Sequence, residues 1–171
     1  PNDTNLIGYF HSYDPWPFGL EGTGSYTFSS ISATQSKYDA VCTWSATKNI
    51  PVYLGEFGSI NKCEYNSRML HYASVTEQAL NHGLAFAAWD DGGDFQIYLR
   101  GSRKWKVQKD ILIHTYKESP TRLQVTIVDS IATLTWTNRT AKNDSIIIEK
   151  GDGDNFSKYI TVAPDANSFT A

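Results

Sequence analysis

The sequence predicts an α/β unit that contains a parallel sheet, followed by an all-β unit. In the first part of the 171-residue chain, three short apolar runs alternate with longer amphipathic stretches. Strands that are apolar throughout and alternate with helices indicate a parallel sheet buried on both faces. After about residue 117 the chain changes to short stretches rich in Val, Ile and Thr, separated by polar turns, which is typical of antiparallel strands.

Three strands and three helices are expected in the first part. Each predicted strand is a short apolar run, and the predicted helices have apolar residues at helical spacing. Gly83 stands directly after the second predicted helix, where a C-terminal cap belongs. In chain order the predicted elements are the strand Leu6–Phe10, the helix Thr34–Lys48, the strand Pro51–Leu54, the helix Glu64–His82, the strand Leu84–Trp89 and the helix Trp105–Tyr116.

The second part is expected to be a β-sandwich. Ala132, Leu134 and Trp136 would point to one side of a strand and the threonines between them to the other, as in a half-buried antiparallel strand. Pro120 disfavours helix at the residue before it, so we expect one domain over residues 1–118 and another over residues 119–171. Further strands are predicted over Leu123–Val128, Ser145–Lys150 and Tyr159–Ala163, with a turn over Lys150–Asp154.

Composition and charge exclude several classes of protein. The chain is 40% hydrophobic and 13% aromatic, too much for a disordered chain, and a net charge of −3 does not suggest a nucleic-acid binder. No apolar run reaches the ~18 residues needed to cross a bilayer, and no basic-then-apolar leader opens the chain. Two cysteines, Cys42 and Cys63, do not make a disulfide scaffold, and whether they are bonded stays open. The aromatic excess suits a sugar-binding cleft, which needs flat apolar faces.

Polar and aromatic side chains follow each of the three predicted strands. In barrels of alternating strands and helices, functional residues lie at the carboxyl ends of the strands. A carboxylate, a His–Tyr pair and a tryptophan at one rim suit glycoside hydrolysis, because that reaction needs an ionised carboxylate near the anomeric carbon and an aromatic face for the sugar. The residues are His11, Tyr13 and Trp16 after the first strand, Glu56 after the second, and Trp89, Asp90 and Asp91 after the third.

The same segments resemble a known family. Leu6–Trp16 (LIGYFHSYDPW), Pro51–Gly58 (PVYLGEFG) and Ala87–Asp91 (AAWDD) look like the last three strand ends of family 5 glycoside hydrolases, the cellulase-like (β/α)8 barrels. The motifs come in the family's order, separated by about one helix plus one strand. The resemblance covers about residues 1–117. It implies a retaining endo-β-1,4-glucanase that cleaves β-glucan polysaccharide. The four histidines lack paired spacing with carboxylates or cysteines, so no metal is expected, and no cofactor is expected either.

The resemblance also implies roles for single residues. Glu56 would be the nucleophile. Tyr13 would hydrogen-bond Glu56 and hold it ionised, and His11 would lie near the acid/base and the bound sugar. Trp89 would form the floor under the sugar at the cleavage point. The candidates for substrate binding are then Trp89, Trp16 and Asp90.

Both modules are expected to be incomplete. Retaining hydrolysis needs a second carboxyl group ~5–5.5 Å from the first, and the family supplies it from an Asn-Glu pair after the fourth strand. The chain contains no Asn-Glu pair, and a complete barrel takes ~250 residues. We therefore expect the last three βα units of a (β/α)8 barrel, inactive alone, with the N-terminal part of the same protein as a partner. Residues 119–171 resemble the start of a fibronectin type III domain, so an incomplete immunoglobulin-like sandwich is expected.

Other interpretations of the same residues stay open. Taken singly, Glu56 could be a surface carboxylate, His11 a core histidine and Trp89 a core filler. A non-catalytic carbohydrate-binding or adhesion module that stacks sugars on Trp16 and Trp89 is the alternative function, and two half-domains rescued by oligomerisation are a third interpretation. The expected partner is a β-glucan polysaccharide or oligosaccharide, with neither nucleic acid nor membrane. Such a polymer substrate implies a secreted, extracellular protein.

Overall fold

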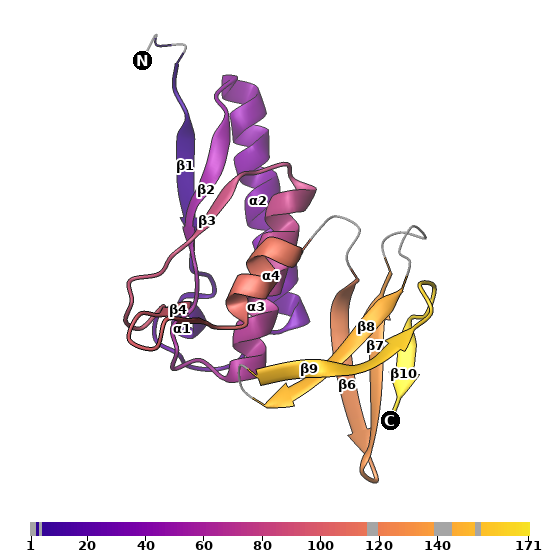
Figure 1. Cartoon of the computed structure of the whole chain (residues 1–171). Coiled ribbons are helices and arrows are strands. Elements are labelled where there is room, and N and C mark those ends of the chain that lie inside the picture. The colour runs from indigo at the N-terminus through magenta and orange to yellow at the C-terminus, as the bar shows by residue number, and fades with distance from the viewer. Residues whose placement is uncertain (1–2, 4, 116–119, 139–144, 153–154) are drawn as a thin grey trace. The chain divides into compact units, whose positions relative to one another are not determined.

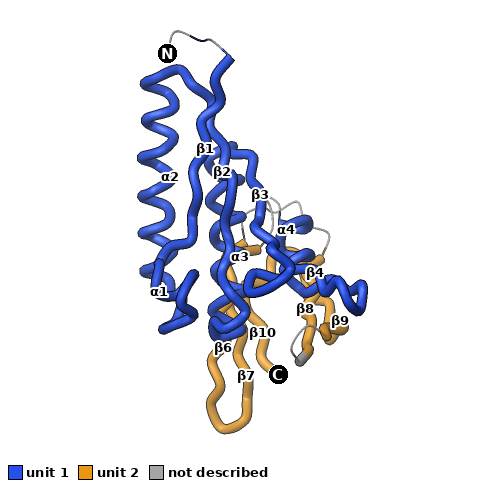
Figure 2. The backbone as a smooth tube through the Cα atoms, turned by 90° about the vertical axis from the view of Figure 1, so that its left-hand side faces the viewer, with its two compact units in different colours: residues 1–115 blue, residues 116–171 orange. Residues whose placement is uncertain are grey.

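The chain forms two compact units, residues 1–115 and residues 116–171, which Figure 2 shows in different colours. The computed structural model describes residue 3 and residues 5–115, 120–138, 145–152 and 155–171. The domain boundary predicted between residues 118 and 119 lies outside the described residues. Each unit is built from its own strands.

A three-stranded parallel sheet is the centre of the first unit. Its strands are β1 (Gly8–Ser12), β2 (Val52–Phe57) and β3 (Phe86–Ala88), in the order β1-β2-β3 (Figure 1). The three predicted apolar runs therefore form the sheet, as expected for strands that alternate with helices.

The register of this sheet brings the ends of its strands together. A bulge after Phe10 shifts the pairing of β1 with β2 by one residue, so that His11 lies opposite Glu56. The end of β3 is tied to the same edge, because the Trp89 amide donates to the Phe57 carbonyl at 2.8 Å. The side chains that follow all three strands therefore start from one edge of the sheet.

Helices follow each strand of the sheet, as the sequence predicts. They are α1 (Trp16–Gly19), α2 (Phe28–Lys48), α3 (Tyr65–Asn81) and α4 (Gln108–His114). α3 agrees with the predicted range to within one residue at each end. Glu64 caps its N-terminus by accepting hydrogen bonds from the amides of Asn66 and Ser67.

The start of α2 differs from the prediction. The helix begins at Phe28 rather than Thr34, and the Thr27 amide donates to the Ser30 side chain at its N-terminus. The serine-rich first turns carry little apolar periodicity, so the sequence pattern did not extend the helix to this cap.

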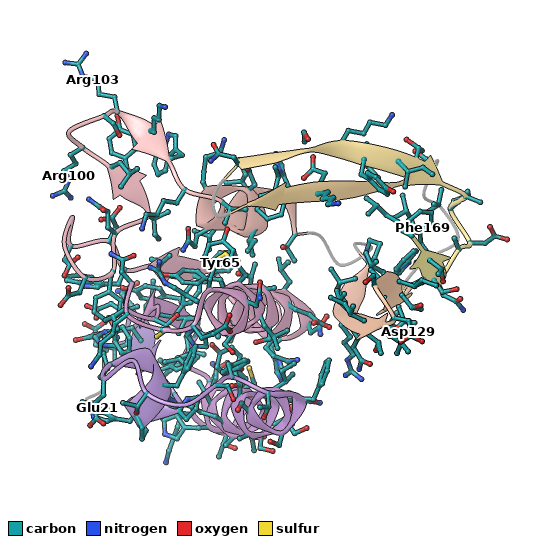
Figure 3. All side chains as sticks on the ribbon, turned by 90° about the horizontal axis from the view of Figure 1, so that it is seen from below. Glu21, Tyr65, Arg100, Arg103, Asp129 and Phe169 are labelled. Carbon is teal, nitrogen blue, oxygen red and sulfur yellow. The ribbon has the colours of Figure 1, made fainter. Side chains whose placement is uncertain are left out.

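The helix predicted over Trp105–Tyr116 begins later than expected, because its first residue, Trp105, lies in a strand; Tyr116 lies outside the described residues. β4 (Tyr98–Leu99) and β5 (Lys104–Trp105) pair as an antiparallel hairpin, and α4 begins only after it. The hairpin is stabilised by the rings of Tyr98 and Trp105, whose centroids are 4.6 Å apart. Arg103, at the turn, points away from the unit (Figure 3).

The first unit is packed on one face of its sheet. α2 and α3 lie against that face (Figures 1 and 2), where Leu54 and Phe57 of β2 are fully buried together with Tyr72 of α3. The opposite face carries Tyr9 and Tyr53, which are 66% and 38% exposed. The expected burial of both faces is thus observed on one face only, because the described residues of this unit supply helices to that face alone.

The second unit consists of antiparallel strands. One sheet has the order β10-β7-β6, and two further strands form the hairpin β8-β9. The strands are β6 (Thr121–Val128), β7 (Ile131–Thr137), β8 (Ile146–Asp152), β9 (Asn155–Val162) and β10 (Ser168–Thr170). Residues 153–154 of the turn predicted over Lys150–Asp154 lie outside the described residues.

The sheet and the hairpin of the second unit each bury one large apolar residue, and a pair of aromatic rings links them. Trp136 of β7 and Ile148 of β8 are buried, which agrees with the core position predicted for Trp136. The ring of Tyr159 on β9 lies 6.1 Å from that of Phe169 on β10. On β6 the alternate residues Leu123, Val125 and Ile127 remain exposed, so one apolar face of this strand is uncovered within the unit.

Candidate active site

Glu56 is the carboxylate at the carboxyl end of β2. Its side chain is 30% exposed, which leaves it accessible while protein surrounds most of it. Gly58, two residues on, lets aromatic rings approach, because a Cβ at this position would lie 3.0 Å from the Phe95 ring and 3.1 Å from the Tyr72 hydroxyl. A larger residue would force these rings away from the strand end.

Tyr13 contacts Glu56 directly. Its hydroxyl donates a hydrogen bond to Glu56 Oε2 at 2.7 Å, and its ring packs edge-on against Phe95 at 5.5 Å between centroids. Burial, followed by the hydrogen bond and the negative charge of Glu56, holds the pKa of Tyr13 above its usual value of 10. The phenol therefore stays un-ionised around neutral pH and acts as a donor to the carboxylate.

His11 completes the contacts of Glu56. Its Nδ1 lies 3.3 Å from Oε2, the same oxygen that accepts from Tyr13, and its side chain is 39% exposed. Within the described part of the chain, Oε1 has no hydrogen-bond partner. One oxygen of Glu56 is thus held by two partners, while the other has none among the described residues.

The loop that carries Tyr13 is held close to the loop after β2. A Cβ on Gly19 would lie 2.1 Å from the Tyr13 carbonyl oxygen, so only glycine fits there. The Gly19 carbonyl accepts from the Ile60 amide at 3.0 Å, and the Phe18 carbonyl accepts from the Cys63 thiol at 3.0 Å. These bonds couple the positions of Tyr13 and Glu56 to each other.

His71, on α3, contacts the loop after β2 and the segment after β1. It was not among the predicted site residues. It is completely buried, with Nδ1 3.1 Å from the Ser59 hydroxyl and its ring 4.9 Å from that of Tyr26. Burial lowers its pKa from 6.5 to about 4. His71 is therefore neutral at pH 7. It lies within a helix, away from the ends of the predicted strands, so no motif pointed to it.

Asn61 and Arg68 connect the loop after β2 to the loop after β3. Neither residue was among the predicted site residues. Asn61 donates to the carbonyls of Asp94 and Gly93, and its side-chain oxygen accepts from Arg68 at 2.7 Å. Buried Arg68 also donates to the Ser59 carbonyl. No local pattern signals these contacts, because they join residues up to 33 positions apart.

Asp90 is placed in the rim but bonds to its own loop. Its carboxylate accepts from the amides of Gly92, Ile97 and Tyr98. Burial alone would raise the pKa of Asp90, but these amides, with Arg100, outweigh it and lower the pKa below its usual value. In this structure its role is to shape the loop that follows Trp89.

Trp89 and Trp16 are accessible, and among the described residues neither forms a hydrogen bond or ion pair with the Glu56 side chain. Trp89, directly after β3, is 41% exposed, and Trp16, the first residue of α1, is 61% exposed. Among the described residues, neither ring stacks on His11 or Tyr13. The structure thus brings Glu56, Tyr13 and His11 together and leaves both tryptophan faces open.

The remaining expectations concern cysteines, metals and membranes. Cys42 and Cys63 are both free thiols, which settles the pairing left open by the sequence. In the described ranges, no group of three or more His, Cys, Asp or Glu side chains is arranged to hold a metal ion. None of the helices formed by the described residues has the length and apolar character needed to cross a membrane.

A comparison with known protein families identifies the family of the first unit. Residues 1–94, which include His11, Tyr13 and Glu56, match the family model described as cellulase (glycosyl hydrolase family 5). The chain belongs to glycosyl hydrolase family 5. The match also includes Trp89, so all three motifs predicted to form the rim lie within the family region.

The family 5 chain is similar to several endoglucanases. It is 35% identical over 115 residues to Endoglucanase H of Acetivibrio thermocellus, covering 63% of this chain and 13% of that protein. It is 30% identical over 132 residues to Endoglucanase A of Clostridium longisporum, and the match covers 68% of this chain and 25% of that protein. Among solved structures, it resembles a GH5-4 broad-specificity endoglucanase from Ruminococcus champanellensis with bound cellotriose. The TM-score is 0.57 and the sequence identity 30%, and the match covers 66% of this chain and 36% of that chain.

These comparisons also define the fold of the first unit. The solved relatives are (β/α)8 barrels, so the parallel strands and helices of the family 5 chain have the architecture of part of such a barrel, as its motifs predicted. The chain spans only 13% and 25% of the two curated relatives, well under two thirds of their length.

Proposed function

We propose that the first unit is part of the catalytic domain of a retaining endo-β-1,4-glucanase, with Glu56 as the nucleophile. One observation carries the proposal. Glu56 Oε2 is held by the Tyr13 hydroxyl at 2.7 Å and faces His11 at 3.3 Å, while Oε1 has no hydrogen-bond partner among the described residues. An oriented carboxylate with one free oxygen suits attack on an anomeric carbon.

The reaction would proceed in two steps. Oε1 of Glu56 attacks the anomeric carbon while the leaving oxygen takes a proton from a second carboxyl group, and a glycosyl ester forms on Glu56. Water then hydrolyses the ester with overall retention of configuration. Throughout, the neutral Tyr13 hydroxyl donates to Oε2 and keeps Oε1 pointing toward the sugar.

The second carboxyl group is assigned to strands that these 171 residues do not contain. The chain has no Asn-Glu pair, and the partners of Glu56 among the described residues are Tyr13 and His11 rather than another carboxylate. The chain by itself is therefore expected to be inactive. The uncovered face with Tyr9 and Tyr53 supports this assignment, because a closed barrel would bury these residues inside.

The proposed substrate is a β-glucan. Relatives of the chain are named endoglucanases, and one related structure contains cellotriose. The exposed faces of Trp89 and Trp16 offer surfaces on which the apolar faces of sugar rings can stack. Asp90 would contribute by holding the loop after Trp89 in place.

We propose that the two units belong to a longer, secreted protein. The first unit would supply the last three βα units of its barrel. The second unit would begin a fibronectin type III-like, immunoglobulin-like sandwich, supported by its antiparallel strands and by buried Trp136. Secretion follows from the proposed polymer substrate, which is too large to enter a cell.

A chimaera tests the role of Glu56. Residues 5–115 would replace the matching part of the barrel of Clostridium longisporum Endoglucanase A, and the product would be assayed on soluble β-glucan. A 2-deoxy-2-fluoro-cellobioside should leave a glycosyl adduct on the peptide that contains Glu56. Glu56→Gln should lower the rate roughly 10³-fold or more, whereas the exposed control Glu21→Gln should not. An active chimaera that tolerates Glu56→Gln would contradict the proposal.

The alternative function is a non-catalytic carbohydrate-binding module, and the exposure of Trp16 and Trp89 favours it. Calorimetric titration of cellohexaose into the chain distinguishes the two functions. Tight binding that is lost in Trp16→Ala and Trp89→Ala, combined with an inactive chimaera, would favour the binding module. A chimaera that forms the Glu56 adduct favours the enzyme.

A further inference from the structure

Lys37 reaches from α2 to the segment that carries His11 and Tyr13. Its ammonium donates to the His11 carbonyl at 3.0 Å and to Asp14 Oδ2 at 2.5 Å. In the chain, the two acceptors lie on opposite sides of Tyr13. One cation therefore fixes both ends of the short segment that presents the Tyr13 hydroxyl to Glu56.

The position of Lys37 is fixed by its neighbours on α2. Tyr38 is fully buried, and its ring packs edge-on against Phe10 of β1 at 5.3 Å between centroids. Thr34, one turn earlier, is buried and hydrogen-bonded to the Tyr26 hydroxyl at 2.9 Å. These contacts hold α2 against β1, so the backbone at Lys37 has a fixed position relative to β1.

We propose that Lys37 is a positioning residue, which holds the segment from His11 to Asp14 so that Tyr13 and His11 meet Glu56. The inference rests on the proposed function of Glu56, and it assigns a part in the site to α2, which contacts none of the reacting atoms. Lys37 and Asp14 are both partly exposed, and such ion pairs contribute little to stability. The effect of Lys37 is therefore expected in the geometry of the site rather than in the stability of the fold.

The ionisation of Tyr13 reports this geometry without any catalysis. The groups around Tyr13 are Glu56 on β2, His11 on β1, Tyr72 on α3 and Asp91 after β3. Burial raises the pKa of Tyr13 and would persist in a variant that keeps its fold, but the contribution of Glu56 depends on the 2.7 Å contact. Loss of that contact should lower the pKa of Tyr13 by roughly one pH unit toward its usual value.

The experiment follows the ¹³Cζ resonance of Tyr13 in the 171-residue chain labelled at tyrosine as the pH is raised from about 8 to 12, and the fraction of Tyr13 that has ionised by about pH 12 gives its titration midpoint. A Tyr13→Phe chain assigns the resonance. Lys37→Met should lower the titration midpoint of Tyr13 by roughly one pH unit, and Lys37→Arg, which keeps a cation, should restore most of it. Lys48→Met, on the same helix but outside these contacts, is the matched control and should leave the midpoint unchanged.

Two results would overturn the inference about Lys37. One is a folded Lys37→Met chain with the wild-type Tyr13 midpoint. The other is a Lys37→Met chain that unfolds at pH 7, because the contact would then hold the fold rather than orient Tyr13. Failure of the proposed function is separate: it would appear as a missing glycosyl adduct on Glu56 in the chimaera, whatever the Tyr13 midpoint does.

Discussion

Acid should destabilise the first unit through one buried histidine. Burial lowers the pKa of His71 from 6.5 to about 4 in the folded chain, whereas in the unfolded chain the side chain returns to its usual value. Between these two pH values the unfolded chain takes up a proton that the folded chain does not. The free energy of unfolding should therefore fall as the pH is lowered from 6.5 to 4, and change little through this residue above that window.

The size of the effect follows from the same two values. The difference between a pKa of 6.5 and one of about 4 corresponds to about 3 kcal/mol of stability lost across the window. Domains of this size are stable by only about 5–15 kcal/mol, so the loss is a substantial fraction of the total. Protonation would also disturb the contact with Ser59, which lies 3.1 Å from Nδ1.

Urea unfolding of the 171-residue chain at a series of pH values between 7 and 4, followed by circular dichroism, measures this effect. His71→Gln cannot titrate, so its stability should fall by about 3 kcal/mol less than that of the wild type over the same range. His114→Gln, at an exposed position on α4, is the control and should keep the wild-type slope. Equal slopes for the wild type and His71→Gln would refute the assignment of acid sensitivity to His71.

Two further predictions concern Tyr13. In the chimaera, Tyr13→Phe removes the 2.7 Å hydrogen bond to Glu56 and should lower kcat/KM by about 10- to 100-fold, because a hydrogen bond to a charged group contributes about 1.5–3 kcal/mol. The control Tyr53→Phe, outside the Glu56 contacts, should leave kcat/KM unchanged. Equal kcat/KM values for the two variants would count against the contact. Gly19→Ala should destabilise the chain by about 1–3 kcal/mol in thermal or urea unfolding, because its Cβ would meet the Tyr13 carbonyl oxygen at 2.1 Å. Gly101→Ala, where nothing lies within 4 Å, is its control, and similar stabilities for the two alanine variants would show that the loop can move aside.

Secondary structure was most predictable where a local signal coincided with a buried face. α3 agrees with its predicted range because its buried face, the Glu64 cap and Gly83 all indicate the same helix. Trp105 shows the opposite case, because its local pattern fits a helix but pairing with Tyr98 places it in a strand. Such pairing depends on a residue outside the local window, so no helical periodicity could reveal it.

The candidate site, too, was predictable from local sequence only in part. The first two strand-end motifs identified His11, Tyr13 and Glu56, and the structure brings these three side chains together. Asp90 shows what the motifs could not specify, since its carboxylate is taken up by backbone amides of its own loop. Whether a carboxylate faces a ligand or its own backbone depends on the path of the loop, which a motif does not encode.

The sequence by itself determined the family, the alternation of strands and helices, and the side chains that follow each strand. These properties depend on residue type and spacing, which can be read along the chain. Only the tertiary structure decided the bulge that sets His11 opposite Glu56, the burial that keeps His71 neutral, and the reach of Lys37 across to Asp14. Each of these depends on how segments far apart in the sequence pack, since packing sets the distances and the exclusion of water from which their chemistry follows.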